Sequence, residues 1–385
     1  MLCLTVTFRI FAANLKKILV LYIFFYNFFA NFKFINLSTY SKLLGVISFR
    51  NGQYQIMFTF TEFNIAVENA EANPQNLDFL NLLSCKWDEV HEKCEVFRYK
   101  INNLQDKVVD GYLLQLNPER NCKRRTPEQI DSICQSFDGT KFNFNKVSPQ
   151  EVLFTFKKDV QVSAVHSVIV NVSPISRYHS LLCPSLEKCL PQVVTEESLE
   201  LVISLMLLVK DRAFRIGFNS LCGLASVNHL HYHIFMENNI LPVETAKCNH
   251  LQGPVYCMNQ DYPIPAFCFQ IPCEDSATNM AKDIYKLLEY LLHKSIAHNI
   301  FITRGESVDS SEKEVIRVLV WPRKSSAGVK QLSAFNVAVL ELSGWFPVYN
   351  ADDFENLQAA DLEKELKKWR IDNFEDLCKE IKSLF

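Results

Sequence analysis

The stretch from residue 226 to 235, SVNHLHYHIF, places three of the nine histidines of the chain at alternate positions. In an extended strand, successive side chains point to opposite faces, so His229, His231 and His233 are expected to share one face. The apolar residues between them then occupy the other face and can pack into a core. On a helix the same spacing would spread the imidazoles around the cylinder. The pattern therefore predicts a strand that presents three imidazoles together.

Three kinds of site fit such a row of imidazoles. Histidines at i and i+2 on a strand can bind zinc, although other ligands would have to come from elsewhere, because no Asp or Glu lies within the motif. The imidazoles could instead be hydrogen-bonded parts of a partly buried face. The third possibility is nucleophilic catalysis at phosphorus. One ring nitrogen then attacks while an acceptor holds the proton of the other, and the neighbouring histidines donate to phosphate oxygens.

A run of small and polar residues, GFNSLCGLASVN at 217–228, immediately precedes the histidines. Small side chains let backbone N–H groups approach an anion closely, so this run beside the histidines favours a phosphate-binding loop over an ordinary hairpin turn. No carboxylate motif for magnesium is apparent near it, and we expect neither a metal nor a cofactor. The candidate substrate-binding residues in the run are Asn219, Ser220, Gly223, Ser226 and Asn228.

Two groups of basic residues are further candidates for contacts with phosphate. Lys123, Arg124 and Arg125 lie in a polar, turn-rich stretch, whereas Arg323 and Lys324 follow an apolar segment. Runs of charge usually face water, so a solvated turn is the competing interpretation for both groups.

Segments on both sides of the histidines match a known family. They are FDGTKFNFNKV, VIVNVSPISRYHSLLCPS, GFNSLCGLASVNHLHYH, and WPRKSSAGVK with AFNVAVLELSGWFPV, in this order within residues 57–350. Together they resemble the histidine-triad superfamily and, within it, the animal-type GDP-glucose phosphorylases. The resemblance implies a histidine-triad-like α+β fold. It also implies that GDP-glucose and inorganic phosphate are converted to GDP and glucose 1-phosphate.

The resemblance further implies a role for each histidine. His231 would be the nucleophile that carries GMP as a covalent intermediate, the backbone carbonyl of His229 would hold its other ring nitrogen, and His233 would contact the phosphates. Plant GDP-galactose phosphorylases carry glutamine at the position of His233, so this residue favours the animal-type activity. A covalent intermediate predicts ping-pong kinetics. A GDP-galactose phosphorylase, a nucleotide hydrolase of the same fold and a catalytically silent GDP-sugar-binding protein are the alternatives.

The chain departs from the family pattern at two positions. Tyr178 precedes His179 where relatives usually have glycine, and Cys222 also stands where a glycine is usual. Glycine permits close backbone approach. The approach of the backbone before His179 and the geometry of the loop at Cys222 are therefore expected to be altered.

The composition indicates a globular protein that does not bind nucleic acid. The 385 residues are 48% hydrophobic, enough for two domains, and the formal net charge of −3 provides no strong attraction for a polyanion. The 13 cysteines include no C-x-x-C pair, which argues against a zinc ribbon or a small disulfide scaffold. Scattered cysteines of this kind favour a reducing compartment, so the expected location is cytoplasmic.

Periodicity and turn residues predict an α+β fold, an antiparallel sheet with flanking helices, in two units. The first, residues 56–245, is the histidine-triad-like catalytic domain, and proline-rich sequence after Pro242 separates it from a C-terminal α+β unit, residues 246–385, with a helical tail. The predicted helices lie at 77–99, 195–210 and 276–293, and the predicted strands at 151–156, 166–172, 214–221, 226–235, 298–305 and 315–323.

The first 55 residues fit neither unit. Residues 18–30, ILVLYIFFYNFFA, form an apolar run after Lys16 and Lys17. The run is short for a membrane-spanning helix, which needs about 20 residues, but long enough for the core of a signal peptide. A targeting segment, an anchor, or sequence upstream of a start at Met57 are the possibilities, so membrane association stays open.

Overall fold

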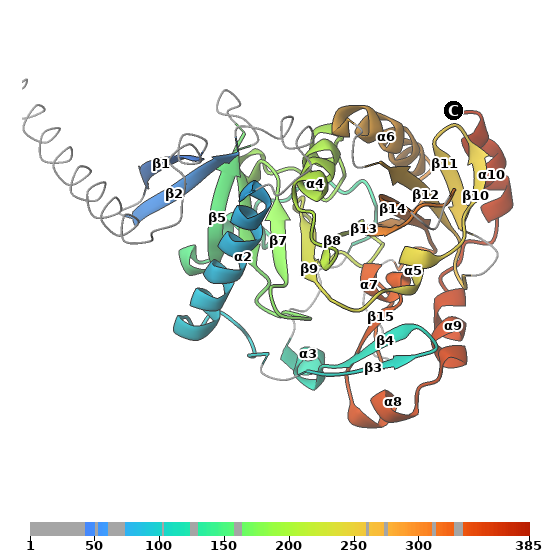
Figure 1. The fold of residues 1–385 in the computed structure, drawn as a ribbon, viewed down its shortest axis with the longest axis horizontal. Helices are drawn as coiled ribbons and strands as arrows, with labels where there is room; N and C mark the ends of the chain where they lie inside the picture. Colours follow the sequence, from blue (N-terminus) through green and yellow to red (C-terminus); the bar gives the residue numbers. More distant parts are fainter. Residues whose placement is uncertain are drawn as a thin grey trace, which may run out of the picture. The chain divides into compact units, whose positions relative to one another are not determined.

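The centre of the fold is a 12-stranded sheet (Figure 1). Its strands are β1 (Leu43–Arg50), β2 (Gln53–Phe60), β5 (Val152–Lys157), β6 (His166–Val170), β7 (Ser180–Cys183), β8 (Phe214–Asn219), β9 (Tyr232–Met236), β10 (Asn249–Gln252), β11 (Val255–Met258), β12 (Ala266–Ile271), β13 (His298–Glu306) and β14 (Glu314–Pro322). They lie in the order β1-β2-β5-β6-β7-β9-β8-β13-β14-β12-β11-β10. β2 is parallel to β5, and every later pair in this order is antiparallel.

The computed structural model describes residues 43–50, 53–60, 74–101, 104–123, 130–157, 164–258, 262–272, 276–309, 313–326 and 334–385. The chain divides at Leu44 into two units, and, apart from the start of β1, all features below lie in the second, Gly45–Phe385. The apolar run at 18–30 lies outside the described residues. Within the described ranges, no helix combines the length and the apolar character that crossing a membrane requires.

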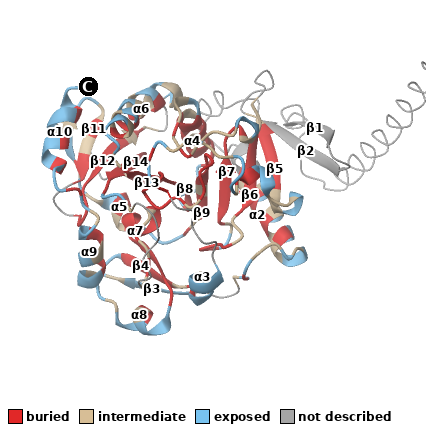
Figure 2. Cartoon of the chain, turned by 180° about the vertical axis from the view of Figure 1, so that it is seen from behind, coloured by how far each residue is buried: buried red, intermediate tan, exposed pale blue. Residues whose placement is uncertain are grey.

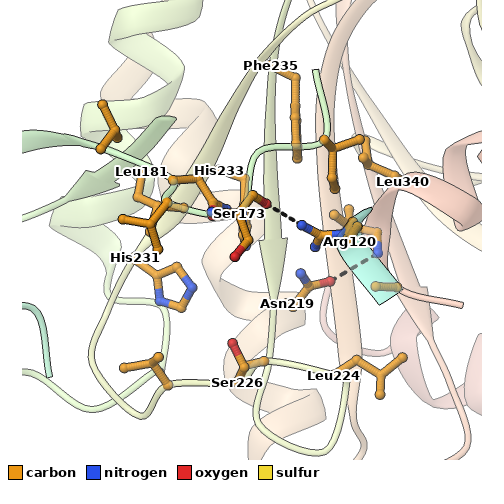
Figure 3. Close-up of a pocket in the computed structure, with 18 of the residues that line it drawn as sticks. Arg120, Ser173, Leu181, Asn219, Leu224, Ser226, His231, His233, Phe235 and Leu340 are labelled. Carbon is orange, nitrogen blue, oxygen red and sulfur yellow. Dashed lines mark hydrogen bonds between the residues drawn. The ribbon is translucent and has the colours of Figure 1, made fainter. Parts of the chain in front are cut away.

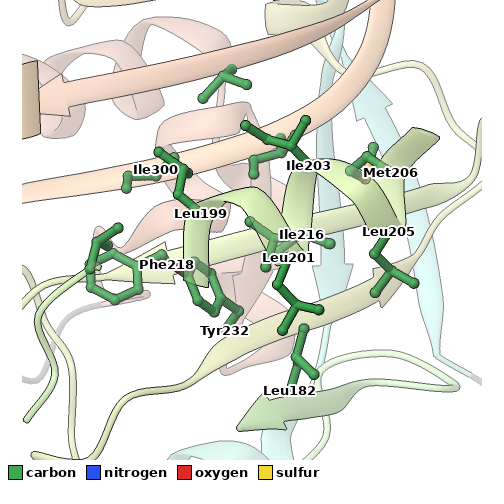
Figure 4. Close-up of a cluster of buried hydrophobic side chains, with 14 of the residues drawn as sticks. Leu182, Leu199, Leu201, Ile203, Leu205, Met206, Ile216, Phe218, Tyr232 and Ile300 are labelled. Carbon is green, nitrogen blue, oxygen red and sulfur yellow. The ribbon is translucent and has the colours of Figure 1, made fainter. Parts of the chain in front are cut away.

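Four helices cover one face of the sheet: α2 (Pro74–Lys93), α4 (Glu196–Leu208), α6 (Ala277–His293) and α10 (Phe374–Lys382). α4 begins as the sequence predicts, because the side chain of Thr195 accepts a hydrogen bond from the N–H of Ser198 (3.1 Å). Nine of the 13 residues of α4 are buried, and Figure 4 shows Leu199, Leu201 and Leu205 among the side chains of the sheet beneath. Burial of this apolar surface is the main force that holds the helices to the sheet.

Strand alternation decides which side chains face away from these helices. Ile216 and Phe218 of β8 and Tyr232 and Ile234 of β9 belong to the core under the helices. Because successive side chains point to opposite faces, His233 lies on the other face of the sheet. Figure 2 shows that the central strands are buried, while helices at the edge of the molecule present exposed outer surfaces.

A second layer covers part of that other face. It contains a 3-stranded sheet in the order β15-β4-β3 and a core of its own. A Cβ on Gly217 of β8 would lie 2.9 Å from the side chain of Val339, so the absence of a side chain there lets α7 approach the large sheet. The elements are β3 (Gln105–Val109), β4 (Tyr112–Leu116), β15 (Trp345–Val348), α3 (Pro118–Lys123), α5 (Pro242–Thr245), α7 (Val339–Ser343), α8 (Ala351–Asn356) and α9 (Ala359–Lys367). Short 3-10 helices complete the described part of the fold: η2 (Phe144–Lys146) and η3 (Pro149–Glu151) precede β5, and η4 (Leu186–Lys188) follows β7.

The predicted α+β class, an antiparallel sheet with flanking helices, is confirmed. β8 lies before residue 245, whereas β13 and β14 lie after it. Because β13 pairs with both β8 and β14, the large sheet contains strands from both sides of residue 245. The division into units 56–245 and 246–385 stays a prediction.

Candidate active site

The strand that carries the histidines begins later than the sequence predicts. β9 starts at Tyr232, and residues 226–229 form a bend ahead of it. The prediction of a strand over residues 226–235 is therefore wrong for its first half. β8 and β9 are paired only as far as Gly217 with His233, and beyond that point the side chain of Gln192 bridges the two segments.

Gln192 takes the place of a strand partner for His231. Its Nε2 donates to the carbonyl oxygens of Asn219 (2.9 Å) and His231 (3.1 Å), and its Oε1 accepts from the N–H of His231 (2.9 Å). Buried backbone groups need such partners. No local sequence pattern points to Gln192, because its amide lies 39 positions before the histidine that it holds.

The ring of His231 is held with one nitrogen available for chemistry. Its Nδ1 lies 2.8 Å from the carbonyl oxygen of His229, so Nδ1 carries the proton and donates it, which leaves the lone pair on Nε2. Burial lowers the pKa of His231 to about 4, although the bond to His229 opposes this shift. The imidazole is therefore neutral at pH 7, and it lines a cavity.

The ring of His229 does not line this cavity. Its Nδ1 accepts a hydrogen bond from the N–H of Phe144 (3.2 Å), and the ring packs against Phe137 and Phe144. Burial lowers its pKa to about 4. The prediction that all three imidazoles share one strand face is wrong for His229, because this residue lies in the bend at 226–229 and its ring packs against Phe137 and Phe144. Its contribution to the site is the carbonyl oxygen that orients His231.

His233 lines the cavity beside His231, and the two ring centroids are 5.2 Å apart. The N–H of Ile175 donates to Nδ1 of His179 (3.0 Å), and Nε2 of the same ring lies 3.0 Å from Nδ1 of His233 and 3.1 Å from Nδ2 of Asn171. Burial keeps His179 neutral by lowering its pKa well below the ordinary value. His179 therefore holds the His233 ring in place beside the cavity.

Two of the predicted loop residues, Asn219 and Ser226, line the cavity. The Oδ1 of Asn219 accepts from Nδ2 of Asn299 (2.6 Å) and from the N–H of Val339 (3.0 Å). These two donors fix the orientation of the Asn219 amide. Figure 3 shows its nitrogen directed into the space between His231 and the opposite side of the cavity.

The other three predicted loop residues do not line the cavity, and each supports the loop instead. Ser220 Oγ accepts from the N–H of His298 (2.9 Å). A Cβ on Gly223 would lie 2.8 Å from the carbonyl oxygen of His298, which leaves no room for a side chain. Asn228 donates to the carbonyls of residues 135 and 136 and accepts from the N–H of Gln192 (2.9 Å).

Of the predicted basic residues, Lys123 is exposed on α3 and pairs with Glu119, and it does not line the cavity. Arg124 and Arg125 lie outside the described residues. Arg120, on the same helix, does line the cavity, although it was not among the predicted substrate contacts. Its sequence context offers little indication of this role, because a sequence pattern cannot tell which basic residue of a short polar helix faces inward.

Arg323 and Lys324 do not line the cavity either. Arg323 is 1% exposed, and its guanidinium lies 4.2 Å from the centre of the Trp369 ring and 3.3 Å from the Asn299 oxygen. Lys324 pairs with Asp372 at the surface (2.8 Å).

The cavity has a volume of about 140 Å³ and two chemically different walls. We call one the apolar wall: Phe142, Phe144, Ile169, Leu181 and Val227. We call the other the polar wall: Arg120, Ser173, Asn336, Glu341 and Tyr349. Figure 3 shows Leu181 and His231 on one side of the space and Arg120 on the other.

Among the described residues, no three His, Cys, Asp or Glu side chains are grouped as a metal ion would require. His229, His231 and His233 therefore do not converge as zinc ligands. The cavity instead offers a neutral imidazole lone pair with hydrogen-bond donors around it, which is the arrangement that nucleophilic attack on a phosphorus centre needs.

Two family models match the chain in succession: GDPGP1-like, N-terminal domain, at residues 78–235, and GDPGP1-like, C-terminal domain, at residues 241–385. The chain belongs to the GDPGP1-like family. The resemblance to the GDP-sugar phosphorylases is thus confirmed.

Curated relatives include GDP-D-glucose phosphorylase 1 of Danio rerio, which is 37% identical over 82% of this chain and 94% of its own length. The Homo sapiens protein of the same name is 40% identical over 69% of this chain and 72% of its own. GDP-L-galactose phosphorylase 2 of Arabidopsis thaliana is more distant, 28% identical over 83% and 78%. A solved structure, yeast Ap4A phosphorylase Apa2 in complex with AMP, has a similar fold, with a TM-score of 0.55 and 15% identity over 77% of this chain and 97% of that chain.

The two positions where this GDPGP1-like chain lacks an expected glycine have unusual backbone angles. Tyr178 has φ 64° and Cys222 has φ 60°, both in the left-handed region that glycine favours. Leu224, in the same loop as Cys222, has φ 76°. The backbone thus adopts a glycine-type conformation with other side chains, at a cost of about 1–2 kcal/mol for each residue.

Proposed function

We propose that this protein is a nucleotidyltransferase that converts GDP-glucose and phosphate into GDP and glucose 1-phosphate, with GMP carried on Nε2 of His231. The observation that carries the proposal is the 2.8 Å contact between His231 Nδ1 and the carbonyl oxygen of His229. Together with the pKa of about 4, it supplies a neutral imidazole with its lone pair in the cavity. The names of the animal relatives support the choice of substrate.

In the first step, Nε2 attacks the phosphorus next to guanosine. The bond from this phosphorus to the oxygen that bridges the two phosphates breaks, and glucose 1-phosphate leaves with that oxygen. The guanylylated ring gains positive charge, and the carbonyl of His229, which accepts from Nδ1, stabilises it.

In the second step, an oxygen of inorganic phosphate attacks the same phosphorus. The P–N bond breaks, its electron pair returns to Nε2, and GDP leaves. His233 and the amide of Asn219 line the cavity beside His231 and are suited to contact the non-bridging oxygens in both steps. The remaining predicted substrate contacts stay predictions.

The apolar wall suits the guanine base. Phe142 and Phe144 bring aromatic faces to the side of the cavity that carries His231, and Phe144 lies 4.9 Å from that ring. A planar base gains by stacking on such surfaces.

Product analysis tests the proposal against its alternatives. With GDP-glucose and phosphate, we expect equal amounts of GDP and glucose 1-phosphate. Without phosphate, glucose 1-phosphate should be released in an amount that does not exceed the enzyme. Continued release of GMP without phosphate would indicate a hydrolase, and no release would indicate a silent binding protein. Comparison of GDP-glucose with GDP-galactose decides the sugar.

We also propose that the protein works in the cytoplasm, with residues 56–245 as the catalytic unit. The cysteines in the described ranges are free thiols, which suits a reducing compartment. Fractionation of the native protein tests the location.

A further inference from the structure

The polar wall has no role in the two displacement steps, although residues in or next to four elements of the fold form it. Arg120 comes from α3, Ser173 follows β6, Asn336 precedes α7, Glu341 lies in α7 and Tyr349 follows β15. These residues are far apart in the sequence. The fold therefore brings these hydrogen-bonding groups together around one cavity, and Figure 3 shows Arg120 across this cavity from His231.

Ser173 is the clearest sign that this wall holds a ligand. The residue is only 6% exposed, it lines the cavity, and its Oγ has no hydrogen-bond partner in the structure. A buried hydroxyl without a partner is destabilising, and such groups are rare. Its backbone carbonyl, by contrast, is bonded to the guanidinium of Arg120.

The charges of the wall distinguish between possible ligands. Glu341 is buried, with 5% exposure, and lies near Arg120. Desolvation acts to lower the pKa of Arg120, but Tyr99, Tyr349 and Glu341 outweigh it and raise that pKa, so the guanidinium stays charged. A carboxylate at 5% exposure would repel a phosphate group. A guanine base needs apolar faces, which the apolar wall supplies.

A hexosyl group fits this set of donors and acceptors. Each sugar hydroxyl both donates and accepts, so it can donate to a carboxylate while it accepts from a guanidinium or an amide. We propose that the polar wall is the subsite for the hexosyl group of the sugar nucleotide, and that Ser173 and Glu341 each bind one of its hydroxyls. This inference rests on the proposed function, since it assigns the sugar end of the same substrate whose diphosphate His231 would attack.

The test uses a reaction that needs His231 but no sugar. The second displacement in reverse, GDP plus the free histidine giving guanylyl-histidine and phosphate, exchanges labelled inorganic phosphate into GDP. Phosphorolysis of GDP-glucose and this exchange are measured for Ser173→Ala and Glu341→Gln. The glutamine can still accept the bond that the N–H of Ala338 donates to Glu341 (2.8 Å), so the start of α7 is retained.

We expect kcat/KM for GDP-glucose to fall about tenfold for Ser173→Ala and about tenfold to 100-fold for Glu341→Gln. Exchange should stay within about twofold of the unmodified protein. The matched control is Ser176→Ala, because Ser176 is also buried with an unpartnered Oγ but does not line the cavity. Both rates should be retained in the control.

Two results would overturn the assignment. If exchange falls together with phosphorolysis, the wall binds the guanosine or phosphate part of the substrate. If neither rate falls, it binds no part of it. Absence of exchange in the unmodified protein is a different failure, because it would contradict the guanylyl-histidine mechanism itself.

Discussion

Two of the groups of arginine and glutamate in the described part of the chain differ in whether the protein supplies all of their hydrogen-bond partners. In the first, Nε of Arg215 lies 2.7 Å from Oε1 of Glu244, the hydroxyl of Thr303 donates to the same carboxylate (2.6 Å), and Nη2 of Arg215 donates to the carbonyl of Asn239 (2.8 Å). We call Arg215, Glu244 and Thr303 the closed network. It does not line the cavity.

The second group is the polar wall, where Arg120 and Glu341 face the cavity and Ser173 Oγ has no partner. The difference separates two uses of buried charge. In the closed network the partners are supplied by the protein, so its contribution is to the fold. In the polar wall, the Ser173 hydroxyl is left to bond a ligand. Substitutions in the polar wall should therefore affect the reaction more than the stability of the fold.

The largest effect that this comparison predicts is on stability. Glu244→Ala leaves Arg215 buried without its carboxylate, and we expect the free energy of unfolding to fall by about 3–5 kcal/mol. Guanylylation per folded molecule should change little. Denaturant unfolding and the rate of glucose 1-phosphate release measure the two quantities.

The matched control is Glu363→Ala, which removes an exposed ion pair with Lys367. This change should cost about 0.5 kcal/mol or less. If Glu244→Ala is as mild as the control, the closed network does not stabilise the fold, and the contrast with the polar wall disappears.

The next effect concerns the residue that positions the nucleophile. Gln192→Ala removes the amide that holds the backbone of His231, and a small displacement of a reacting group can slow a reaction about 100-fold. We expect kcat to fall roughly tenfold to 100-fold while KM for GDP-glucose stays within about twofold. Steady-state kinetics with this variant would refute the positioning role if KM rose and kcat did not change.

A smaller effect follows from the buried imidazoles. His229 and His231 each have a pKa lowered to about 4 by burial, from an ordinary value of 6.5. Between these values the unfolded chain binds protons that the folded chain does not, so stability falls as the pH drops from 6.5 towards 4. Each histidine contributes roughly 1.4 kcal/mol per pH unit in this window and nothing above it.

Unfolding curves at several pH values measure this slope. His231→Asn should reduce it by the contribution of one histidine. An unchanged slope would mean that His231 is protonated equally in both states, and the neutral nucleophile would lose its support.

The sequence predicted the regular part of this structure better than the irregular part. The helix predicted at 195–210 contains α4, and the strand predicted at 214–221 contains β8. The start of β9 was predicted too early because Gln192 replaces a strand partner, and no local pattern records a contact across 39 positions. Arg120 was missed because its neighbour Lys123 has the same charge and the opposite orientation.

The central claim is a covalent bond between GMP and Nε2 of His231. Incubation with GDP-glucose in the absence of phosphate, followed by mass spectrometry of the intact protein and of its peptides, tests it most directly. The account predicts an acid-labile mass increase of one GMP, located on the peptide that contains His231, removed by phosphate with release of GDP, and absent from His231→Asn. Glucose 1-phosphate formation by a protein that never carries GMP, or a GMP adduct on another residue, would contradict it.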